Sequence, residues 1–382
     1  MININYTKQY IDKDDKKAVL NVLNSDYLTQ GKYITEFENK LSKFFNAKYC
    51  TTVSSGTAGL HLVGKALGWT KNDYVVTTPI TFVASSNSIE YSGARTILCD
   101  IEEKFNTIDP NKLEKIIKNS ILNNKKIKAV IAVDYAGMLC DWEALKYLSN
   151  KYKIILINDN CHALGSKFKN SNSYALNYAH VVIQSFHPAK NITTGEGGAV
   201  LTNSKIINDK VRSFRTHGVD YTKKRKYNWD YSIQNIGYNY RLTDIQCALG
   251  ISQLKKIFKF TKKRNEIAKY YDLKITNDLI KLPLSKKHVY NSYNLYPVKI
   301  NFNASKYNKL ETYNLFKKNG ISLQVHYKPI HFYEYYKKKY KFKRKDFPIS
   351  EKFYQSVFSI PIYYKLQIKE QKKIVNLLNN II

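Results

Sequence analysis

The chain has 382 residues, of which 43% are hydrophobic and 14% aromatic. A chain of this size can bury a sizeable core in two domains, or in one large domain with an appendage, and its composition excludes a disordered protein. No run of about 18 consecutive apolar residues occurs, and the first ten residues, MININYTKQY, lack the pattern of a signal peptide. We therefore expect a globular cytoplasmic protein with no membrane span.

The net charge of +32 comes mainly from lysine and has two interpretations. A basic chain can bind the phosphates of nucleic acid. Here the lysines are spread along the chain among abundant Asn, Ile, Tyr and Phe, a mixture that an AT-rich genome encodes, so we expect no nucleic-acid partner. The densest run, Lys337 to Lys345, could attract the phosphates of a nucleotide or could be a solvated loop. The five scattered cysteines predict neither disulfides nor a metal site.

Short apolar, β-branched runs alternate with amphipathic helical patterns through the first two-thirds of the chain. This alternation predicts an α/β fold with a mainly parallel sheet. The predicted strands are 49–53, 74–78, 96–100, 128–134, 154–158, 181–186 and 199–202, and the predicted helices include 60–67, 113–121 and 142–152.

The pattern changes after about residue 250. We expect one long, lysine-rich helix over 251–271, followed by an extended segment over 292–300, a helix over 306–318, a strand over 321–326 and a closing helix over 366–378. These elements predict a smaller α+β domain. We therefore divide the chain into a large domain, residues 1–250, which includes an N-terminal arm, and a small C-terminal domain, residues 251–382.

Three segments carry the residue types that cofactor chemistry needs. The first, SSGTAG over residues 54–59, follows a predicted strand and opens a helical pattern. Small residues let the backbone approach an anion closely, and the amides and hydroxyls at a helix N-terminus can then hold a phosphate. An ordinary helix cap explains the same residues equally well.

The second segment, INDNCHALG over residues 157–165, places Asp159 directly after an apolar strand. Ligands of open α/β sheets bind at the carboxyl ends of the strands. A carboxylate there can keep a pyridine nitrogen protonated, which makes the ring an electron sink. The alternatives are a helix N-cap for Asp159 and a packed, hydrogen-bonded core histidine for His162. Taken alone, each alternative is the stronger interpretation.

The third segment, SFHPAKNITTGEGG over residues 185–198, follows a predicted strand and puts Lys190 in a turn rich in Thr and Gly. A lysine must lose its proton before it can form a Schiff base, and desolvation or nearby cations favour that loss. Lys190 could instead be one of the many solvated loop lysines of this chain. The order of a phosphate loop, Asp159 and then Lys190 is more specific than any of its three parts.

This arrangement resembles the DegT/DnrJ/EryC/StrS sugar aminotransferases, which have the fold type I of pyridoxal-phosphate (PLP) enzymes. The resemblance runs from about Lys8 to the C-terminus. It implies a large domain with a mainly parallel seven-stranded sheet, a smaller C-terminal α+β domain, PLP as the cofactor and a homodimer with shared active sites. It implies no metal.

The resemblance also implies roles for single residues. Lys190 matches the catalytic lysine that holds PLP as a Schiff base and moves protons, and Asp159 matches the carboxylate that faces the pyridine nitrogen. His162 matches a residue near the phenolic oxygen of the cofactor. Phe82 matches the aromatic residue that stacks on the ring, with a core phenylalanine as the competing interpretation. The implied phosphate ligands are Gly56, Thr57, Ser185 and, from the neighbouring subunit, Asn239, and the weaker substrate candidates are Arg241, His326 and Tyr327.

Within this family the chain resembles enzymes that aminate C4 of a sugar. The motifs are SFHPAK followed by ITTGEGG, QVHYKPI over 324–330, LTQGK over 28–32 and DYAG over 134–137. They imply transfer of an amino group from L-glutamate to a UDP-linked 4-keto-6-deoxy sugar with ping-pong kinetics. Four alternatives remain: another nucleotide-linked keto-sugar as substrate, a PLP-dependent sugar dehydratase (disfavoured because such relatives lack the lysine), an inactive sugar-binding relative, and a nucleic-acid-binding protein.

Overall fold

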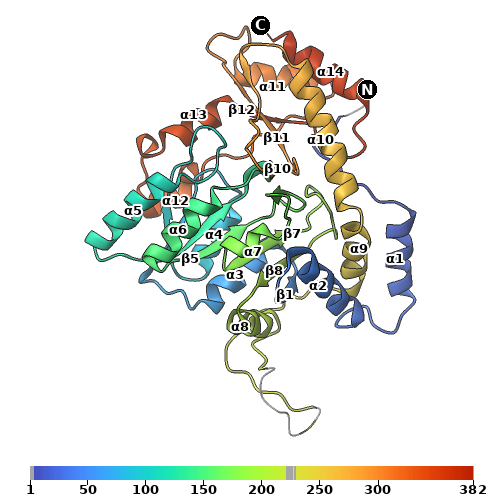
Figure 1. Cartoon of the computed structure of the whole chain (residues 1–382), viewed down its shortest axis with the longest axis vertical. Coiled ribbons are helices and arrows are strands. Elements are labelled where there is room, and N and C mark those ends of the chain that lie inside the picture. The colour runs from blue at the N-terminus through green and yellow to red at the C-terminus, as the bar shows by residue number, and fades with distance from the viewer. Residues whose placement is uncertain (1–3, 221–226, 228, 382) are drawn as a thin grey trace.

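The computed structural model describes residues 4–220, 227 and 229–381 (Figure 1). A seven-stranded sheet with the order β1-β8-β7-β5-β4-β2-β3 forms its centre. The strands are β1 (Tyr49–Val53), β2 (Asp73–Thr77), β3 (Arg95–Leu98), β4 (Lys126–Val133), β5 (Ile155–Asp159), β7 (Val181–Ser185) and β8 (Gly198–Thr202). Each matches a strand predicted from the sequence to within two residues.

The sheet is mainly parallel, as predicted. Strands β3, β2, β4, β5 and β7 run parallel to one another, and β8 is antiparallel to both β1 and β7. Asp159, the last residue of β5, pairs with Val133 of β4 and with Ile183 of β7. The carboxyl ends of these three strands therefore meet at one edge of the sheet, the edge at which open α/β folds bind ligands.

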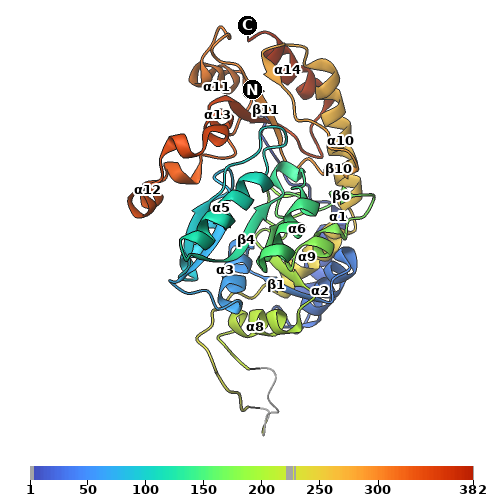
Figure 2. The ribbon, with the colours of Figure 1, turned by 60° about the vertical axis from the view of Figure 1, so that its left-hand side comes forward.

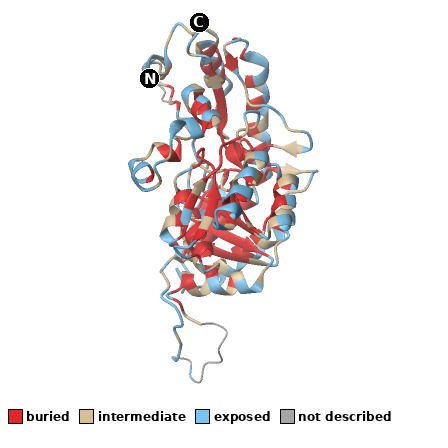
Figure 3. Ribbon diagram, turned by 90° about the vertical axis from the view of Figure 1, so that its left-hand side faces the viewer, coloured by how far each residue is buried: buried red, intermediate tan, exposed pale blue. Residues whose placement is uncertain are grey.

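Helices cover both faces of this sheet, so the large domain has three layers. Successive strand residues point to opposite faces: Val182 packs in the hydrophobic cluster on one side and Ile183 in the cluster on the other. Buried residues are concentrated in the sheet, which is mostly red in Figure 3. The helices are α1 (Lys13–Leu23), α2 (Lys32–Phe45), α3 (Gly56–Ala66), α4 (Ala84–Tyr91), α5 (Pro110–Leu122), η1 (Tyr135–Gly137), α6 (Trp142–Tyr152), α7 (Tyr174–Tyr178), α8 (Lys205–Arg215) and α9 (Asp244–Leu254).

The C-terminal part has its own hydrophobic cluster around a three-stranded antiparallel sheet, β12-β11-β9. It lies at the upper end of the molecule in Figures 1 and 2, and α12 reaches from it alongside the large domain. A two-stranded ribbon, β6 (Lys167–Phe168) with β10 (Val289–Tyr290), links the two parts. The remaining elements are α10 (Ile257–Lys274), β9 (Ile280–Lys281), β11 (Tyr296–Ile300), α11 (Lys309–Lys318), η2 (Ile330–Phe332), α12 (Glu334–Tyr340), η3 (Arg344–Asp346), α13 (Pro348–Ser356), β12 (Val357–Ile360) and α14 (Ile368–Asn379).

Two predicted elements of the C-terminal part are wrong. The helix expected over 251–271 is two helices, α9 and α10, and Lys256 at the break forms an ion pair of 2.9 Å with the buried Asp15 of α1. The strand expected over 321–326 makes only two isolated bridges, Ile321 with Ile4 and Gln324 with Ser359. Both differences depend on partners far away in the sequence, which local periodicity does not report.

The division at residue 250 stays a proposal. The C-terminal hydrophobic cluster runs from Ile267 to Ile381 and, among the described residues, takes only Ile4 from the N-terminal part, which supports a separate small domain. Ile251 and Ile257, however, pack in a large-domain cluster. Helix α10 thus begins on one core and ends on the other. None of the helices in the described part of the chain is long and apolar enough to cross a membrane.

Residues 4–6, which we call the N-terminal strap, lie against the C-terminal part. The Ile4 amide donates to the Gly320 carbonyl at 2.8 Å, and the Ser322 amide donates to the Ile4 carbonyl at 2.8 Å. The Ile362 amide donates to the Tyr6 carbonyl at 3.1 Å. These backbone hydrogen bonds join the N-terminal strap to the C-terminal part.

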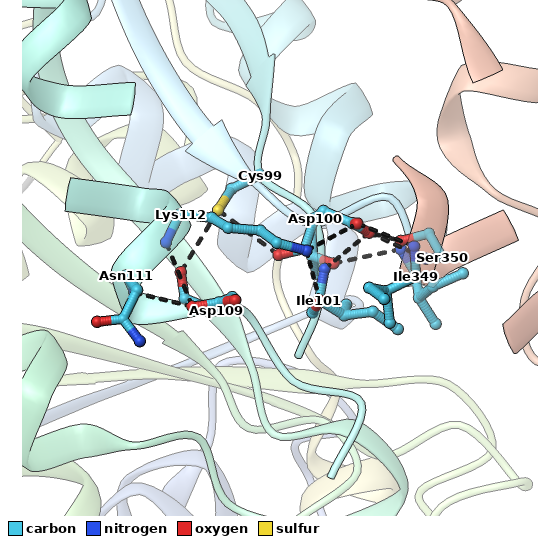
Figure 4. Close-up of polar contacts among 10 residues, drawn as sticks. Cys99, Asp100, Ile101, Asp109, Asn111, Lys112, Ile349 and Ser350 are labelled. Atoms are coloured by element: carbon cyan, nitrogen blue, oxygen red, sulfur yellow. Dashed lines mark hydrogen bonds and ion pairs between the residues drawn. The ribbon is translucent and has the colours of Figure 1, made fainter. Parts of the chain in front are cut away.

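A buried carboxylate, Asp100, also joins the two parts (Figure 4). It follows β3 and accepts hydrogen bonds from the amides of Ile349 and Ser350, at 3.1 and 3.0 Å, in the first turn of α13. No side chain of the helix's own N-cap residue does this. Asp100 therefore caps a helix that lies about 250 residues further along the chain.

Candidate active site

A cavity of about 640 Å³ lies where the carboxyl edge of the sheet meets the C-terminal part. Residues from the ends of β4, β5 and β7, from the starts of α3 and α4, and from the C-terminal part line it. The structure brings together these predicted site residues: Gly56, Thr57, Phe82, Asp159, His162, Ser185, Lys190, His326 and Tyr327. Asn239 and Arg241 do not line it.

The N-terminus of α3 forms one wall of the cavity. The Ser55 side chain caps the helix by accepting from the Ala58 amide at 3.0 Å, so the helix-cap interpretation is correct for Ser55. The next residues, Gly56 and Thr57, face the cavity. A β-carbon on Gly56 would lie only 3.0 Å from the β-carbon of Ser185, so a residue larger than glycine would crowd β7. The helix amides are thereby left close to Ser185, as a phosphate site requires.

Asp159 ends β5 and is only 6% exposed. Its carboxylate accepts from the Ser85 hydroxyl at 2.7 Å and from the Cys161 amide at 3.3 Å. No helix follows β5 directly, so the N-cap interpretation of Asp159 is wrong. Ser85 itself pairs with Thr81 at 2.8 Å. No local sequence signal indicates Ser85, because 74 residues separate it from the carboxylate that it orients.

Lys190 lies in the loop after β7 and lines the same cavity. Its loop is held from two sides: the Asn191 side chain donates to the Leu164 carbonyl, and the Asn294 side chain donates to the Ala189 carbonyl, both at 2.9 Å. Burial lowers the pKa of Lys190, and the nearby Asp159 only partly opposes this effect. Lys190 is therefore not a solvated loop lysine, and a larger share of its amine is unprotonated than in water.

His162 is buried and hydrogen-bonded, as the competing interpretation expected, and it also lines the cavity. Its Nδ1 accepts from the Ala136 amide at 3.3 Å, and its Nε2 lies 3.0 Å from the Tyr327 hydroxyl. Desolvation, together with the charge of Lys190, lowers the pKa of His162 well below its usual value. The imidazole is therefore neutral at physiological pH.

The opposite wall comes from the C-terminal part and the N-terminal strap. His326 Nδ1 lies 2.9 Å from the Ser359 hydroxyl, and burial lowers the pKa of His326 to about 3. Phe82 is 55% exposed, and its ring centroid lies 5.9 Å from that of Tyr327, so the core interpretation of Phe82 is wrong. Sequence analysis did not find Tyr6, Glu196, Asn294 and Leu295, which also line the cavity.

The segment that carries Asn239 and Arg241 runs along the surface. Asn239 is exposed and forms a bridge with Thr216, while the carbonyl of Tyr240 accepts from the Ser54 amide at 2.8 Å. Close by along the chain, the large apolar side chains of Trp229 and Ile236 are 78% and 87% exposed. Within one chain, this segment therefore supplies no residue to the cavity wall.

A doubly covered, mainly parallel sheet with a lysine, a buried strand-end carboxylate and a helix N-terminus at its carboxyl edge is the arrangement expected of the aminotransferases of fold type I. The chain belongs to the DegT/DnrJ/EryC1/StrS aminotransferase family, whose model matches residues 9–379. This confirms the fold class and the family expected from the sequence.

Relatives cover nearly the whole chain. The UDP-4-amino-4,6-dideoxy-N-acetyl-β-L-altrosamine transaminase of Campylobacter jejuni (strain 81-176) is 38% identical, with 99% of this chain and 97% of the relative covered. The transaminase of the same name from Helicobacter pylori is 36% identical over 97% and 96%. Among solved structures, the H. pylori aminotransferase PseC, which is involved in pseudaminic acid biosynthesis, matches with a TM-score of 0.90 and 34% identity, covering 98% of each chain.

The family is PLP-dependent. A related structure from Streptococcus pneumoniae, Spr1654, has been solved in a PLP form and in a pyridoxamine-phosphate (PMP) form. Its PLP form matches with a TM-score of 0.89 and 26% identity, covering 99% of this chain and 98% of that chain. The fold of this chain is therefore one that holds PLP in a relative.

Proposed function

We propose that this aminotransferase moves an amino group from L-glutamate to C4 of UDP-2-acetamido-2,6-dideoxy-β-L-arabino-hexos-4-ulose. The product would be UDP-4-amino-4,6-dideoxy-N-acetyl-β-L-altrosamine, an intermediate of pseudaminic acid biosynthesis. Full-length relatives with this activity in their names, at 36–38% identity, support the substrate. The observation that carries the reaction type is the meeting of Lys190, Asp159 and the start of α3 in one cavity.

The residues present fit PLP as the cofactor, which we propose binds in this cavity. The cradle at Gly56 places helix amides beside Ser185, where a phosphate would accept hydrogen bonds. Asp159, oriented by Ser85, supplies a negative charge for a protonated pyridine nitrogen. When bound, PLP supplies an aldehyde that takes up the amino group and a ring that accepts the electron pair of a broken carbon–hydrogen bond.

Each proposed role follows from the surroundings of the residue. Lys190, with its lowered pKa, can attack an aldehyde and then accept and return a proton at the carbon that bears the amino group. Phe82 leaves its ring free to cover one face of the cofactor. His326, Tyr327 and Tyr6 would close the cavity against water on the sugar side.

We also propose the homodimer with shared active sites. The exposed Asn239 and the apolar surface at Trp229 and Ile236 support a partner subunit that covers this segment and receives Asn239 in its own cavity. Arg241 stays a weaker substrate candidate by the same route. The cytoplasmic location and the absence of a nucleic-acid partner stay predictions.

A second candidate is a 4-aminotransferase for another nucleotide-linked keto-sugar. The GDP-perosamine synthase of Escherichia coli O157:H7 is 35% identical over 280 residues, which is 73% of each chain, and this similarity favours it among the alternatives.

The test is to incubate the purified protein with PLP, L-glutamate and the UDP-linked 4-keto sugar, and to analyse the product by mass spectrometry and NMR. We expect an amino sugar together with an equal amount of 2-oxoglutarate, and the new stereocentre should have the altrosamine configuration. Amination of a GDP-linked 4-keto sugar alone would transfer the assignment to the second candidate. If glutamate left a visible lysine-bound cofactor band unchanged, the aminotransferase proposal itself would fail.

Lys190→Ala tests the assigned lysine. We expect loss of turnover and of the visible band of the lysine-bound cofactor, because Lys190 is the one lysine that lines the cavity among the residues that the structure describes. Lys205→Ala is the matched control, since Lys205 lies on the surface with its side chain 68% exposed. Unchanged amino transfer by Lys190→Ala would exclude the role.

A further inference from the structure

A closed ring of hydrogen bonds joins three segments at the cavity wall. The Tyr135 hydroxyl donates to the His326 carbonyl at 2.6 Å, and the neighbouring Tyr327 hydroxyl lies 3.0 Å from His162 Nε2. His162 Nδ1 accepts from the amide of Ala136, the residue after Tyr135, at 3.3 Å. The ring therefore runs from the η1 turn through the C-terminal part and the loop after β5, and back to η1.

The η1 turn is held rigidly, so the amide of Ala136 points in a fixed direction. Ala136 has φ 59° and Gly137 has φ 93°, a left-handed pair that only a few residue types adopt. A β-carbon on Gly137 would lie 2.4 Å from the Asn291 side-chain oxygen, and the Ser166 hydroxyl donates to the Gly137 carbonyl at 2.7 Å. Rotation of the turn away from His162 would therefore break the hydrogen bond from Ser166.

The fixed amide determines which nitrogen of His162 carries the hydrogen. A neutral imidazole has one N–H and one lone pair. Because the Ala136 amide donates to Nδ1, the lone pair is on Nδ1 and the hydrogen is on Nε2. Since His162 stays neutral in its buried position, this tautomer persists across the physiological range. His162 Nε2–H is therefore the donor, and the Tyr327 oxygen is the acceptor.

The direction of this bond leaves the hydrogen of the Tyr327 hydroxyl available. Within the described part of the chain, His162 is its one hydrogen-bond partner, and the Tyr327 side chain lines the cavity. Burial raises the pKa of Tyr327 well above its usual value, so the hydroxyl keeps its hydrogen. An acceptor for that hydrogen has to come from a molecule in the cavity.

We propose that Tyr327 donates a hydrogen bond to an oxygen of the bound reactants at the reacting end of the cavity, and that His162 and the Ala136 amide are the positioning groups that aim it. The acceptor is a carbonyl or phenolate oxygen. It belongs either to the keto group of the sugar or to the cofactor. The choice between these two sources rests on the function proposed above, whereas the direction of the hydrogen bond does not.

The first test reads the tautomer and needs no substrate. The side-chain ¹⁵N signals of the full-length protein are recorded after histidine labelling, and the His162 signals are assigned by their loss in His162→Gln. We expect a bare Nδ1 and a protonated Nε2 for His162, in the wild type and in Tyr327→Phe alike. A protonated Nδ1 would overturn the proposal, because Tyr327 would then donate to His162 and offer nothing to the cavity.

The second test separates the two acceptors with the PLP-loaded Tyr327→Phe protein, in which only the hydroxyl is removed. If the sugar accepts, the sugar half-reaction slows about tenfold, as for the loss of one hydrogen bond, while the glutamate half-reaction and the cofactor spectrum are unchanged. If the cofactor accepts, the pKa of the visible cofactor band rises by about one unit. If the rates and the spectrum both match the wild type, the proposal is refuted.

His162 variants test the positioning role. His162→Leu removes the donor and should slow the same step as Tyr327→Phe, whereas His162→Gln supplies an amide N–H and should recover most of that loss. The His162→Leu/Tyr327→Phe double variant should be no slower than the slower single variant, because both changes break the same arrangement. If the losses of rate in the two single variants were fully additive in the double variant, the positioning role of His162 would be contradicted. A wild type that does not aminate the UDP-sugar would sink the proposed function, while the tautomer and the spectral test would still decide this inference.

Discussion

Asp100 should contribute far more to stability than an ordinary helix cap. The carboxylate is 4% exposed and accepts from two amides of α13, from the Ser350 hydroxyl at 2.5 Å, and from Lys112 Nζ at 3.0 Å (Figure 4). Asp109 is the matched control shown in the same figure. It caps α5 by accepting from the amides of Asn111 and Lys112, and it is not fully buried.

The magnitude of Asp100→Ala can be worked out contact by contact. Losing the cap of α13 costs about 1 kcal/mol. Losing a hydroxyl bond to a buried carboxylate costs about 1.5–3 kcal/mol. The ion pair with Lys112, whose side chain is 35% exposed, adds less than about 1 kcal/mol. We therefore expect Asp100→Ala to lower the free energy of unfolding by about 4 kcal/mol and Asp109→Ala by about 1 kcal/mol.

The assay is urea unfolding at 25 °C, followed by tryptophan fluorescence and by circular dichroism. If the two probes have coincident transitions, the two-state analysis holds and the midpoints convert to free energies. Separate transitions in Asp100→Ala alone would mean that the C-terminal part unfolds independently of the large domain. This result would also agree with a role of Asp100 in joining the two parts. Equal losses for Asp100→Ala and Asp109→Ala would refute the reasoning, because the contacts to α13 would then contribute nothing.

Three further variants test the site and the core. Asp159→Asn keeps a partner for Ser85 but removes the charge, so we expect turnover to fall by about a hundredfold or more with the fold unchanged by circular dichroism. Gly137→Ala should lower the melting temperature by several degrees and weaken PLP binding in a fluorescence titration, because its β-carbon would meet Asn291; a wild-type melting temperature would show that the turn can yield. Burial lowers the pKa of Lys309 from 10.5 to about 8, so between these values the unfolded chain binds a proton that the folded chain does not, and stability rises with pH. Lys309→Met should remove this rise, as urea midpoints from pH 7 to pH 10.5 would reveal.

The elements of the large domain could be predicted from the sequence because their signals are local. Each strand of the central sheet is a short apolar run, and Asp159 and Ser185 lie at strand ends that a parallel sheet must bring to one edge. Ser54 and Ser55 before α3, and Gly56 as its first residue, likewise indicate a helix N-terminus. The grouping of Asp159, Ser185 and Lys190 at one edge of the sheet could therefore be predicted from the sequence.

The parts that sequence analysis missed depend on long-range contacts. Ser85 reaches Asp159 from another strand connection, and Asn294 holds the Lys190 loop from more than 100 residues away. No proline or glycine marks the break between α9 and α10. At this break Lys256 forms an ion pair with Asp15, which lies far away in the sequence. Such partners become visible only when the fold is known.

The N-terminal strap has a consequence for how the protein is made. Ile4 leaves the ribosome well before its partners at Gly320 and Ser322, which follow it about 300 residues later, with Tyr327 just after them. At translation rates of roughly 5–20 residues per second, the strap waits about 15–60 s without its partners. The cavity wall is incomplete until Tyr327 has emerged, so a nascent chain can close this cavity around a bound molecule only after residue 327 has been made.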